Sequence, residues 1–128
     1  MNIESFPEID SWKEARIFVK DIYKITSRGS ITKDFGFKDQ LQRAAVSIMT
    51  NIAEGFDSGS NKSFINFLNY AYRSASEVQS LLYIALDIEY ISIEQFNGLT
   101  EKSEKIKKLI GGFIQYLKNS NYKPRTKN

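Results

Sequence analysis

The amino-acid sequence predicts an all-α fold, an antiparallel four-helix bundle whose helices run up, down, up and down. Apolar residues recur at spacings of three and four along four long segments, which is the period of an amphipathic helix. The two prolines, Pro7 and Pro124, both lie outside these segments. The links between the segments are short, and short links favour antiparallel neighbours.

The first two helices are expected at residues 12–27 and 38–54. Ser11 and Glu14 form an S-x-x-E pair, which is typical of a helix start because each side chain can satisfy a free backbone N–H. Gly55 is expected to end the second helix, since glycine readily adopts the left-handed conformation found there. The apolar stripes of the two helices are Trp12, Ala15, Phe18, Val19, Ile22 and Tyr23, then Leu41, Ala44, Ala45, Ile48 and Ile52.

The third helix is expected at residues 62–89, and the fourth after Ser92. Ser92 forms a second capping pair with Gln95. Gly111 and Gly112 lower helix propensity and are interpreted as a close contact or a bend. The two stripes are Phe64, Phe67, Leu68, Ala71, Ala75, Val78, Leu82 and Ala85, then Phe96, Leu99, Ser103, Ile106, Ile110, Phe113 and Leu117.

With 128 residues the chain is long enough for one domain and too short for two. We expect a bundle over residues 1–118, with a short acidic lead at 1–10, and a flexible basic tail at 119–128. Residues 101–128 contain eight Lys and Arg against two acids, whereas residues 1–100 contain ten against thirteen. This asymmetry favours an anionic partner. The alternative is a solubilising helix face with a frayed end.

The sequence excludes several classes of protein. It contains no cysteine, so a disulfide scaffold is impossible and a cytoplasmic location is expected. No apolar run is long enough to span a membrane, and the acidic start lacks the features of a signal peptide. Because histidine is also absent, Ser-His-Asp and Cys-His catalysis and His-based metal sites are impossible. We expect no enzymatic activity, no metal and no cofactor.

Polar residues interrupt the second and third segments. Arg73 and Glu77 are four residues apart, a spacing at which opposite charges pair on a helix. We interpret the set as a structural network of salt bridges that fixes the helix register. One alternative is an arginine cluster that grips phosphates, and another is a cryptic enzyme that uses Glu54 and Glu77. The network consists of Arg43, Asn51, Glu54, Arg73 and Glu77.

A second apolar edge runs along the third segment, formed by Ile65, Tyr72, Tyr83 and Leu86. A helix of a four-helix bundle needs only one apolar stripe. The second edge therefore predicts burial against another subunit, and these residues are the predicted oligomer interface. The alternative is a wide stripe that faces a broad core.

The sequence also resembles a known family. It carries the run Ala44-Ala45-Val46-Ser47-Ile48, followed by Asn51-Ile52-Ala53-Glu54-Gly55. Further matching positions are Trp12 to Ala15, Ser63-Phe64, Phe67-Leu68, Ser74 and Glu77. Over residues 10–118 the chain is similar to the four-helix-bundle family of the 23S rRNA intervening-sequence proteins. That family also includes the accessory variability determinant of diversity-generating retroelements.

The resemblance implies an antiparallel bundle that assembles into a ring-like homopentamer with no established enzymatic activity. It implies RNA or DNA as a partner and, in the retroelement branch, a reverse transcriptase. Many members place a basic residue in the loop after Gly55, where this chain has Asp57. The predicted phosphate contacts therefore move to the last helix and the tail. They are Lys102, Lys105, Lys107, Lys108, Lys118, Lys123, Arg125 and Lys127.

The functional prediction is a non-enzymatic, oligomeric protein that binds nucleic acid or assists an enzyme that does. Lys102, Lys105 and Lys108 are three residues apart and can share one face of a helix. Nothing in the sequence resembles a module that reads bases, so binding is expected to follow the phosphate backbone. The alternative is a protein-interaction scaffold with no nucleic-acid role.

Overall fold

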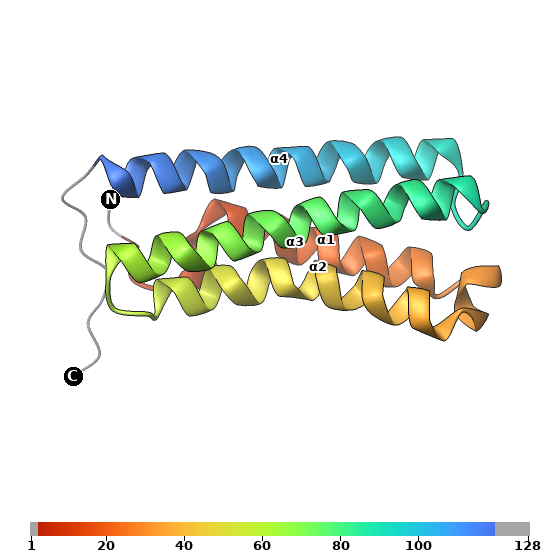
Figure 1. Cartoon of the computed structure of the whole chain (residues 1–128), viewed down its shortest axis with the longest axis horizontal. Helices are drawn as coiled ribbons and strands as arrows, with labels where there is room; N and C mark the ends of the chain where they lie inside the picture. The colour runs from red at the N-terminus through yellow and green to blue at the C-terminus, as the bar shows by residue number, and fades with distance from the viewer. Residues whose placement is uncertain (1–2, 120–128) are drawn as a thin grey trace.

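The computed structural model describes residues 3–119. The four helices run alternately in opposite directions along one long axis (Figure 1), and within residues 3–119 there is no strand. Each helix packs against its two neighbours in a closed ring, α1 on α2, α2 on α3, α3 on α4 and α4 on α1. The prediction of an all-α four-helix bundle is confirmed. The elements are the 3₁₀ helix η1 (Phe6–Glu8), α1 (Asp10–Thr26), the 3₁₀ helix η2 (Ser30–Lys33), α2 (Phe35–Phe56), α3 (Asn61–Asp87) and α4 (Ile93–Lys118).

The start of α1 differs from the sequence prediction. Ser11 lies inside the first turn of α1, is 2% exposed, and forms no capping bond with Glu14. The capping box that forms is Ser5 with Glu8, one element earlier, at the start of η1. The backbone N–H groups of Ser5 and Glu4 donate to the Glu8 carboxylate and lower its pKa. Both stretches match S-x-x-E, so the pattern alone does not tell which one is used.

Helix α2 begins three residues earlier than expected, because Asp34 acts as its N-cap and accepts a hydrogen bond from the Phe37 N–H at 3.2 Å. It also continues through Gly55, so the prediction that this glycine ends the helix is wrong. A Cβ at Gly55 would lie 2.8 Å from the Cβ of Phe67 and 2.9 Å from the Cδ1 of Phe64. Gly55 therefore permits the close approach of α2 and α3.

The core follows the predicted stripes. The large side chains that it buries completely include Phe18, Ile22, Leu41, Ile48, Ile52, Phe64, Leu68 and Leu82. Tyr23 is an exception, since it is 46% exposed. The predicted α4 capping box of Ser92 and Gln95 is confirmed. In the described part of the chain, no helix combines the length and the apolar character that a membrane crossing requires.

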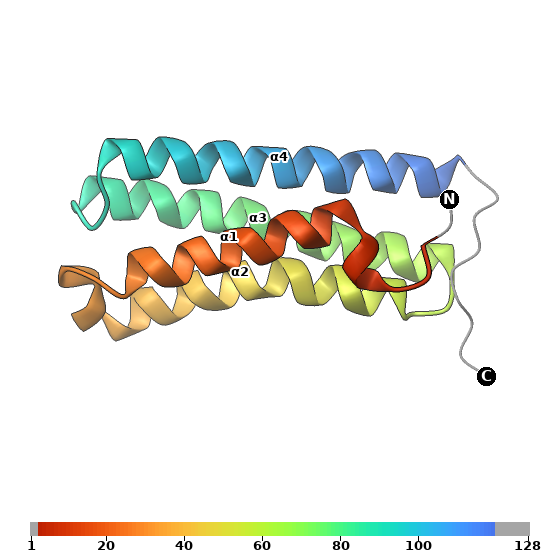
Figure 2. The same ribbon diagram turned by 180° about the vertical axis from the view of Figure 1, so that it is seen from behind.

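The helices of the bundle are unequal in length. Helix α1 has 17 residues and α4 has 26, which at 1.5 Å per residue makes α4 about 13 Å longer. Upstream of α1 the chain turns through η1 towards α2 (Figure 2), leaving the last turns of α4 partly uncovered. Gly111 and Gly112 lie within this long helix, and a Cβ added at either would have no atom of residues 3–119 within 4 Å except those of its chain neighbours and of its own helix backbone. The close contact predicted for them is absent, and α4 continues through both.

Candidate nucleic-acid interface

Lys102 and Lys105, predicted to contact phosphates, face acids of α1. The Lys102 ammonium donates to the carboxylate of Asp21, and the Lys105 ammonium donates to the Oε1 of Glu14 at 3.0 Å. The lysine side chains are 48% and 62% exposed, so these bridges contribute little to stability, about 0–1 kcal/mol each. The two ion pairs matter more for the predicted binding of phosphates than for stability, because an incoming phosphate must compete with a carboxylate already in place.

Lys107 points to the opposite side of α4. Its ammonium donates to the Oε1 of Gln79 at 3.1 Å and lies 4.9 Å from the ring centroid of Tyr72. The Lys107 side chain is only 16% exposed. Lys107 therefore packs α4 against α3, and little of its side chain is left exposed for the predicted phosphate contact.

Lys108 and Lys118 are exposed and have no ion pair or hydrogen bond to another side chain within residues 3–119. Lys102, Lys105 and Lys108 line one open depression on the outer face of α4, so the sequence correctly placed these three on one face. Acids alternate with them along the depression, which Glu14, Glu101 and Glu104 also line. The other predicted basic contacts, Lys123, Arg125 and Lys127, lie outside the described residues.

The distribution of charge over the chain is uneven. Residues 3–119 contain fifteen Lys and Arg and fifteen Asp and Glu, so the bundle carries no net charge. The net charge of +3 therefore comes entirely from Lys123, Arg125 and Lys127. Over residues 3–119 as a whole the basic residues are balanced in number by acids, and the unbalanced positive charge belongs to the segment that follows.

The predicted polar network does not form as a unit. The Arg43 side chain is 79% exposed and donates to Asp39 at 2.8 Å, one turn away on the same helix. The Arg73 guanidinium lies 5.7 Å from the ring centroid of Tyr70. Within residues 3–119 neither arginine forms an ion pair with another helix, and Glu54 is exposed. These side chains point outward because the α2–α3 contact is made by small and apolar residues.

A different polar cluster joins α2 to α3. The hydroxyls of Ser47 and Ser74 lie 2.8 Å apart, and the side-chain amide of Asn51 donates to the Ser47 hydroxyl at 2.9 Å. Nearby, Gln40 donates to the Glu77 carboxylate at 3.4 Å, so Glu77 pairs with α2 instead of with an arginine of its own helix. Glu77 thus makes a contact between helices, whereas Asn51 bonds within α2 to the serine that meets Ser74. The serine pair was missed because serines show no charge pattern in sequence.

The predicted oligomer interface divides into two kinds of residue. Ile65 and Leu86 are half-buried and pack against the core of their own chain. Tyr72 and Tyr83 are 39% and 57% exposed at the α3–α4 edge, where Tyr83 also meets the ring of Phe96 at 4.9 Å. The two tyrosines therefore leave aromatic surface uncovered, while Ile65 and Leu86 fit the alternative of a wide stripe.

Further exposed apolar residues lie at the end of the bundle where α2 and α4 begin and α3 ends. Ile84 of α3 is 44% exposed and Ile88, which caps its end, is 49% exposed, while Ile93 is 54% exposed and Phe35 is 72% exposed. Sequence periodicity did not single them out. Ile88 and Ile93 border the turn between α3 and α4, where a helical repeat gives no information.

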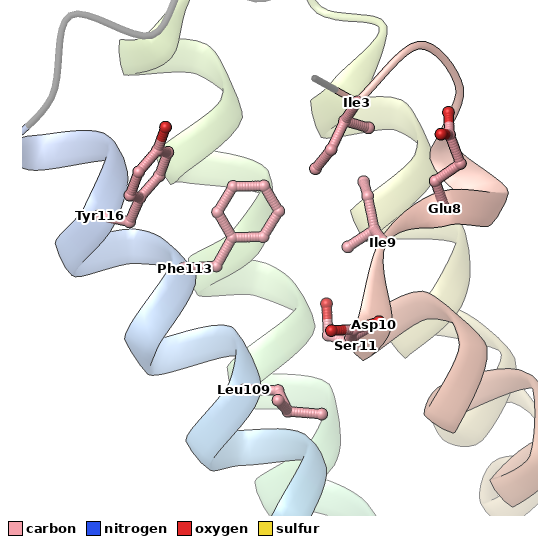
Figure 3. A pocket seen from close by; sticks show the side chains of 8 residues that line it. All are labelled: Ile3, Glu8, Ile9, Asp10, Ser11, Leu109, Phe113 and Tyr116. Carbon is pink, nitrogen blue, oxygen red and sulfur yellow. The ribbon is translucent and has the colours of Figure 1, made fainter. Parts of the chain in front are cut away.

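A cavity of about 350 Å³ opens between the start of α1 and the last turns of α4. In Figure 3 the side chains of Ile3 and Ile9 face the ring of Phe113 across it. Its other lining residues are Glu8, Asp10, Ser11, Leu109 and Tyr116. The Ser11 hydroxyl is buried and has no hydrogen-bond partner among residues 3–119. Within residues 3–119 no group of three or more acidic side chains has an arrangement that could hold a metal ion.

Comparison with known proteins agrees with this architecture. A family model described as 23S rRNA-intervening sequence protein matches residues 7–112. A solved structure of a protein with unknown function, from the S23 ribosomal protein family of Bacteroides thetaiotaomicron, is 29% identical with a TM-score of 0.77. The alignment covers 83% of this chain and 96% of that one. No curated protein matches the sequence. The chain therefore belongs to the family of 23S rRNA-intervening sequence proteins.

Proposed function

We propose that this protein is a non-enzymatic, self-associating protein that binds nucleic acid through the basic segment after α4. The supporting observation is the position of the net charge. The bundle is neutral over residues 3–119, and the three residues that supply +3 follow α4 within nine positions. Lys108 and Lys118 are the exposed lysines of α4 that can extend this contact, since neither is held by a side chain in the described part.

The mode of binding follows from the type of residue. Lysine and arginine on a short segment neutralise phosphates without reading bases, so affinity is expected to depend on salt more than on sequence. Self-association would repeat the segment in each subunit and raise the overall affinity through multivalency. The same surface suits an accessory protein of a nucleic-acid enzyme such as a reverse transcriptase. The cysteine-free composition supports a cytoplasmic location.

The test is binding of a labelled single-stranded RNA by fluorescence anisotropy across a range of salt concentrations. Each phosphate contact contributes about −0.7 to the slope of log affinity against log salt for single strands. Neutralising the segment with Lys123→Gln, Arg125→Gln and Lys127→Gln should therefore make the slope shallower by about 2. A DNA strand of the same sequence, measured in parallel, gives the preference between the two nucleic acids.

The matched control neutralises three exposed basic residues, two on α1 and one just after it, by Lys20→Gln, Lys24→Gln and Arg28→Gln, which changes the net charge equally. The slope of this control should remain that of the natural chain. An equal reduction of the slope in both variants would mean that binding responds only to the net charge of the protein. Absence of binding at low salt would remove the nucleic-acid proposal altogether.

A second candidate function is a protein-interaction scaffold. The observation that favours it is the group of exposed apolar side chains Phe35, Ile84, Ile88 and Ile93. Apolar surface of this kind commonly marks contact with another protein. Partners that remain on the immobilised chain after nuclease treatment, and are lost from an Ile84→Ser, Ile88→Ser variant, would support this function over the first.

A further inference from the structure

The cavity between α1 and α4 is a consequence of their unequal lengths. Ile3 and Ile9 form one apolar wall, and Leu109 and Phe113 form the other. Helix α4 passes the start of α1, where η1 carries the chain towards α2 instead of along α4. Both walls of the cavity are therefore aromatic or aliphatic. The acids that line it, Glu8 and Asp10, lie on the α1 side.

The seam between α1 and α4 is a series of acid–lysine contacts that stops at this cavity. Asp21 pairs with Lys102, and one step further along Glu14 pairs with Lys105. The next acid of α1 in this direction is Asp10, which lines the cavity opposite Leu109 and Phe113. No cation within residues 3–119 pairs with Asp10. The cavity thus combines apolar walls with an unmatched negative charge.

Residues 120–128 have the complementary composition. Tyr122 is aromatic, Lys123 follows it directly, and Arg125 is two residues further on. The segment also starts at the right place, because α4 ends at Lys118, two residues beyond the Tyr116 that lines the cavity. From Asn119, three extended residues reach about 10 Å, whereas Phe113 lies about 9 Å back along the helix axis. Tyr122 can therefore reach the cavity when the chain folds back.

We propose that the segment 120–128 docks on its own bundle, with Tyr122 in the cavity between α1 and α4 and Lys123 or Arg125 against Asp10. An aromatic ring contributes the most apolar area of any side chain type, and the ring of Phe113 offers it an edge-to-face partner. The basic neighbour completes the series of contacts begun by Lys102 and Lys105. Docking of this kind is intramolecular and costs little closure entropy, because the loop is short.

The docking proposal stands without the proposed function, but one consequence rests on it. If the segment also binds phosphates, then docked and RNA-bound forms compete for the same residues. The Tyr122→Ala variant should then bind RNA more tightly than the natural chain, the opposite of the charge-neutralised variant. Weaker RNA binding by Tyr122→Ala would contradict this competition, and would leave the docking to be decided by the measurement below.

The docking is tested on the full chain by paramagnetic relaxation. The chain contains no cysteine, so a single Thr126→Cys substitution carries one nitroxide. Isoleucine methyl groups report its position without further change. Ile3 and Ile9 line the cavity, Ile65 lies near the same end of the bundle on α3, and Ile88 lies at the far end. We expect loss of the Ile3 and Ile9 signals, with those of Ile65 and Ile88 retained.

Two substitutions and their controls make the test specific. Tyr122→Ala and Asp10→Asn should each restore the Ile9 signal, whereas Asn121→Ala and Glu101→Gln should leave it lost. Equal attenuation of Ile9 and Ile65, or attenuation that survives Tyr122→Ala, would overturn the proposal. A second sample mixes isotope-labelled chains that carry no nitroxide with unlabelled chains that carry it. In this mixture only docking between two copies of the chain can attenuate the signals. Signal loss in that mixture would assign the cavity to the segment of a second copy, and would overturn docking within one chain.

Discussion

At the scale of single residues, two glycines in helix interiors have opposite surroundings. Gly55 in α2 lies against α3, and a Cβ there would come within 3 Å of Phe64 and Phe67. Gly112 in α4 is exposed and has open space around it. Glycine is unfavourable in any helix, so only the first position has a packing reason for it. Sequence alone gave the two glycines the wrong roles, because their neighbours come from other helices.

The two glycines give a paired prediction for stability. Gly55→Ala should destabilise the protein by about 1–3 kcal/mol, the usual cost of overpacking a close contact. Gly112→Ala should stabilise it by about 0.5–1 kcal/mol, because alanine loses less chain entropy in a helix and meets no atom. Urea unfolding followed by circular dichroism, at one protein concentration, measures both. A Gly55→Ala variant as stable as the natural chain would contradict the close approach of α2 and α3.

Tyr90 and Asp34 give a second prediction at this scale. The Tyr90 hydroxyl donates to the Asp34 Oδ2 at 2.7 Å, and the same carboxylate caps α2. This hydrogen bond, which the tyrosinate cannot make, raises the pKa of Tyr90 above its ordinary value of 10.0. Tyr90→Phe should lower the free energy of unfolding at neutral pH, because the hydrogen bond to Asp34 is lost.

The pH dependence of that difference follows from the sign of the shift. Because the folded-state pKa of Tyr90 is the higher one, its contribution is complete below pH 10.0 and is lost as the pH rises through the folded value. The stability difference between the natural chain and Tyr90→Phe should therefore shrink in alkaline solution. Tyr23→Phe, at an exposed position, is the control and should show no such change. A difference that stays constant above pH 10.0 would contradict a role for the phenol proton.

At the scale of elements, the seam between α1 and α4 is where the structure most alters the functional prediction. Lys102 and Lys105 were expected to face a phosphate, and instead they face Asp21 and Glu14. Lys107 was expected beside them and instead packs on α3. Spacing along α4 correctly placed Lys102, Lys105 and Lys108 on one face. It gave no information on which helix that face meets.

The ion pair of Glu14 and Lys105 can be measured by a double-mutant cycle. The variants are Glu14→Gln, Lys105→Gln and both together. The coupling energy should be at most about 1 kcal/mol in 0.1 M salt and should fall further in 1 M salt, because the pair is exposed and screened. Asp39 with Arg43, a pair within one helix, is the comparison. A coupling that does not respond to salt would argue against a simple exposed ion pair.

At the scale of the whole molecule, the bundle is neutral and leaves apolar surface uncovered on both sides of α3. Tyr72 and Tyr83 lie at the α3–α4 edge, and Ile84 and Ile88 are also exposed. A neutral body with exposed apolar residues favours association, since little charge repulsion opposes contact between copies. The edge that contains Tyr72 and Tyr83 belongs to the predicted interface. The exposed side chains of Ile84 and Ile88 are the alternative site of contact.

Sedimentation equilibrium tests self-association directly. The natural chain should have a mass of two or more times the 14.7 kDa of one chain. Tyr72→Ser with Tyr83→Ser should reduce the mass towards that of the monomer, whereas Ile84→Ser with Ile88→Ser should leave it unchanged. Circular dichroism should show that both variants keep their helices. A monomeric natural chain, or dissociation caused only by the isoleucine variant, would contradict the predicted interface.

The sequence by itself determined the fold class, the number of helices, and most of the core, because all of these depend on apolar periodicity along one helix. It also identified the Ser92 and Gln95 capping box, in which both partners are close in sequence. Only the tertiary structure decided the role of Gly55, the partners of Lys105 and Lys107, and the cavity beside Phe113. Each of these depends on which side chains from different helices meet, and on how far one helix extends past another. A repeat of 3.6 residues contains neither kind of information.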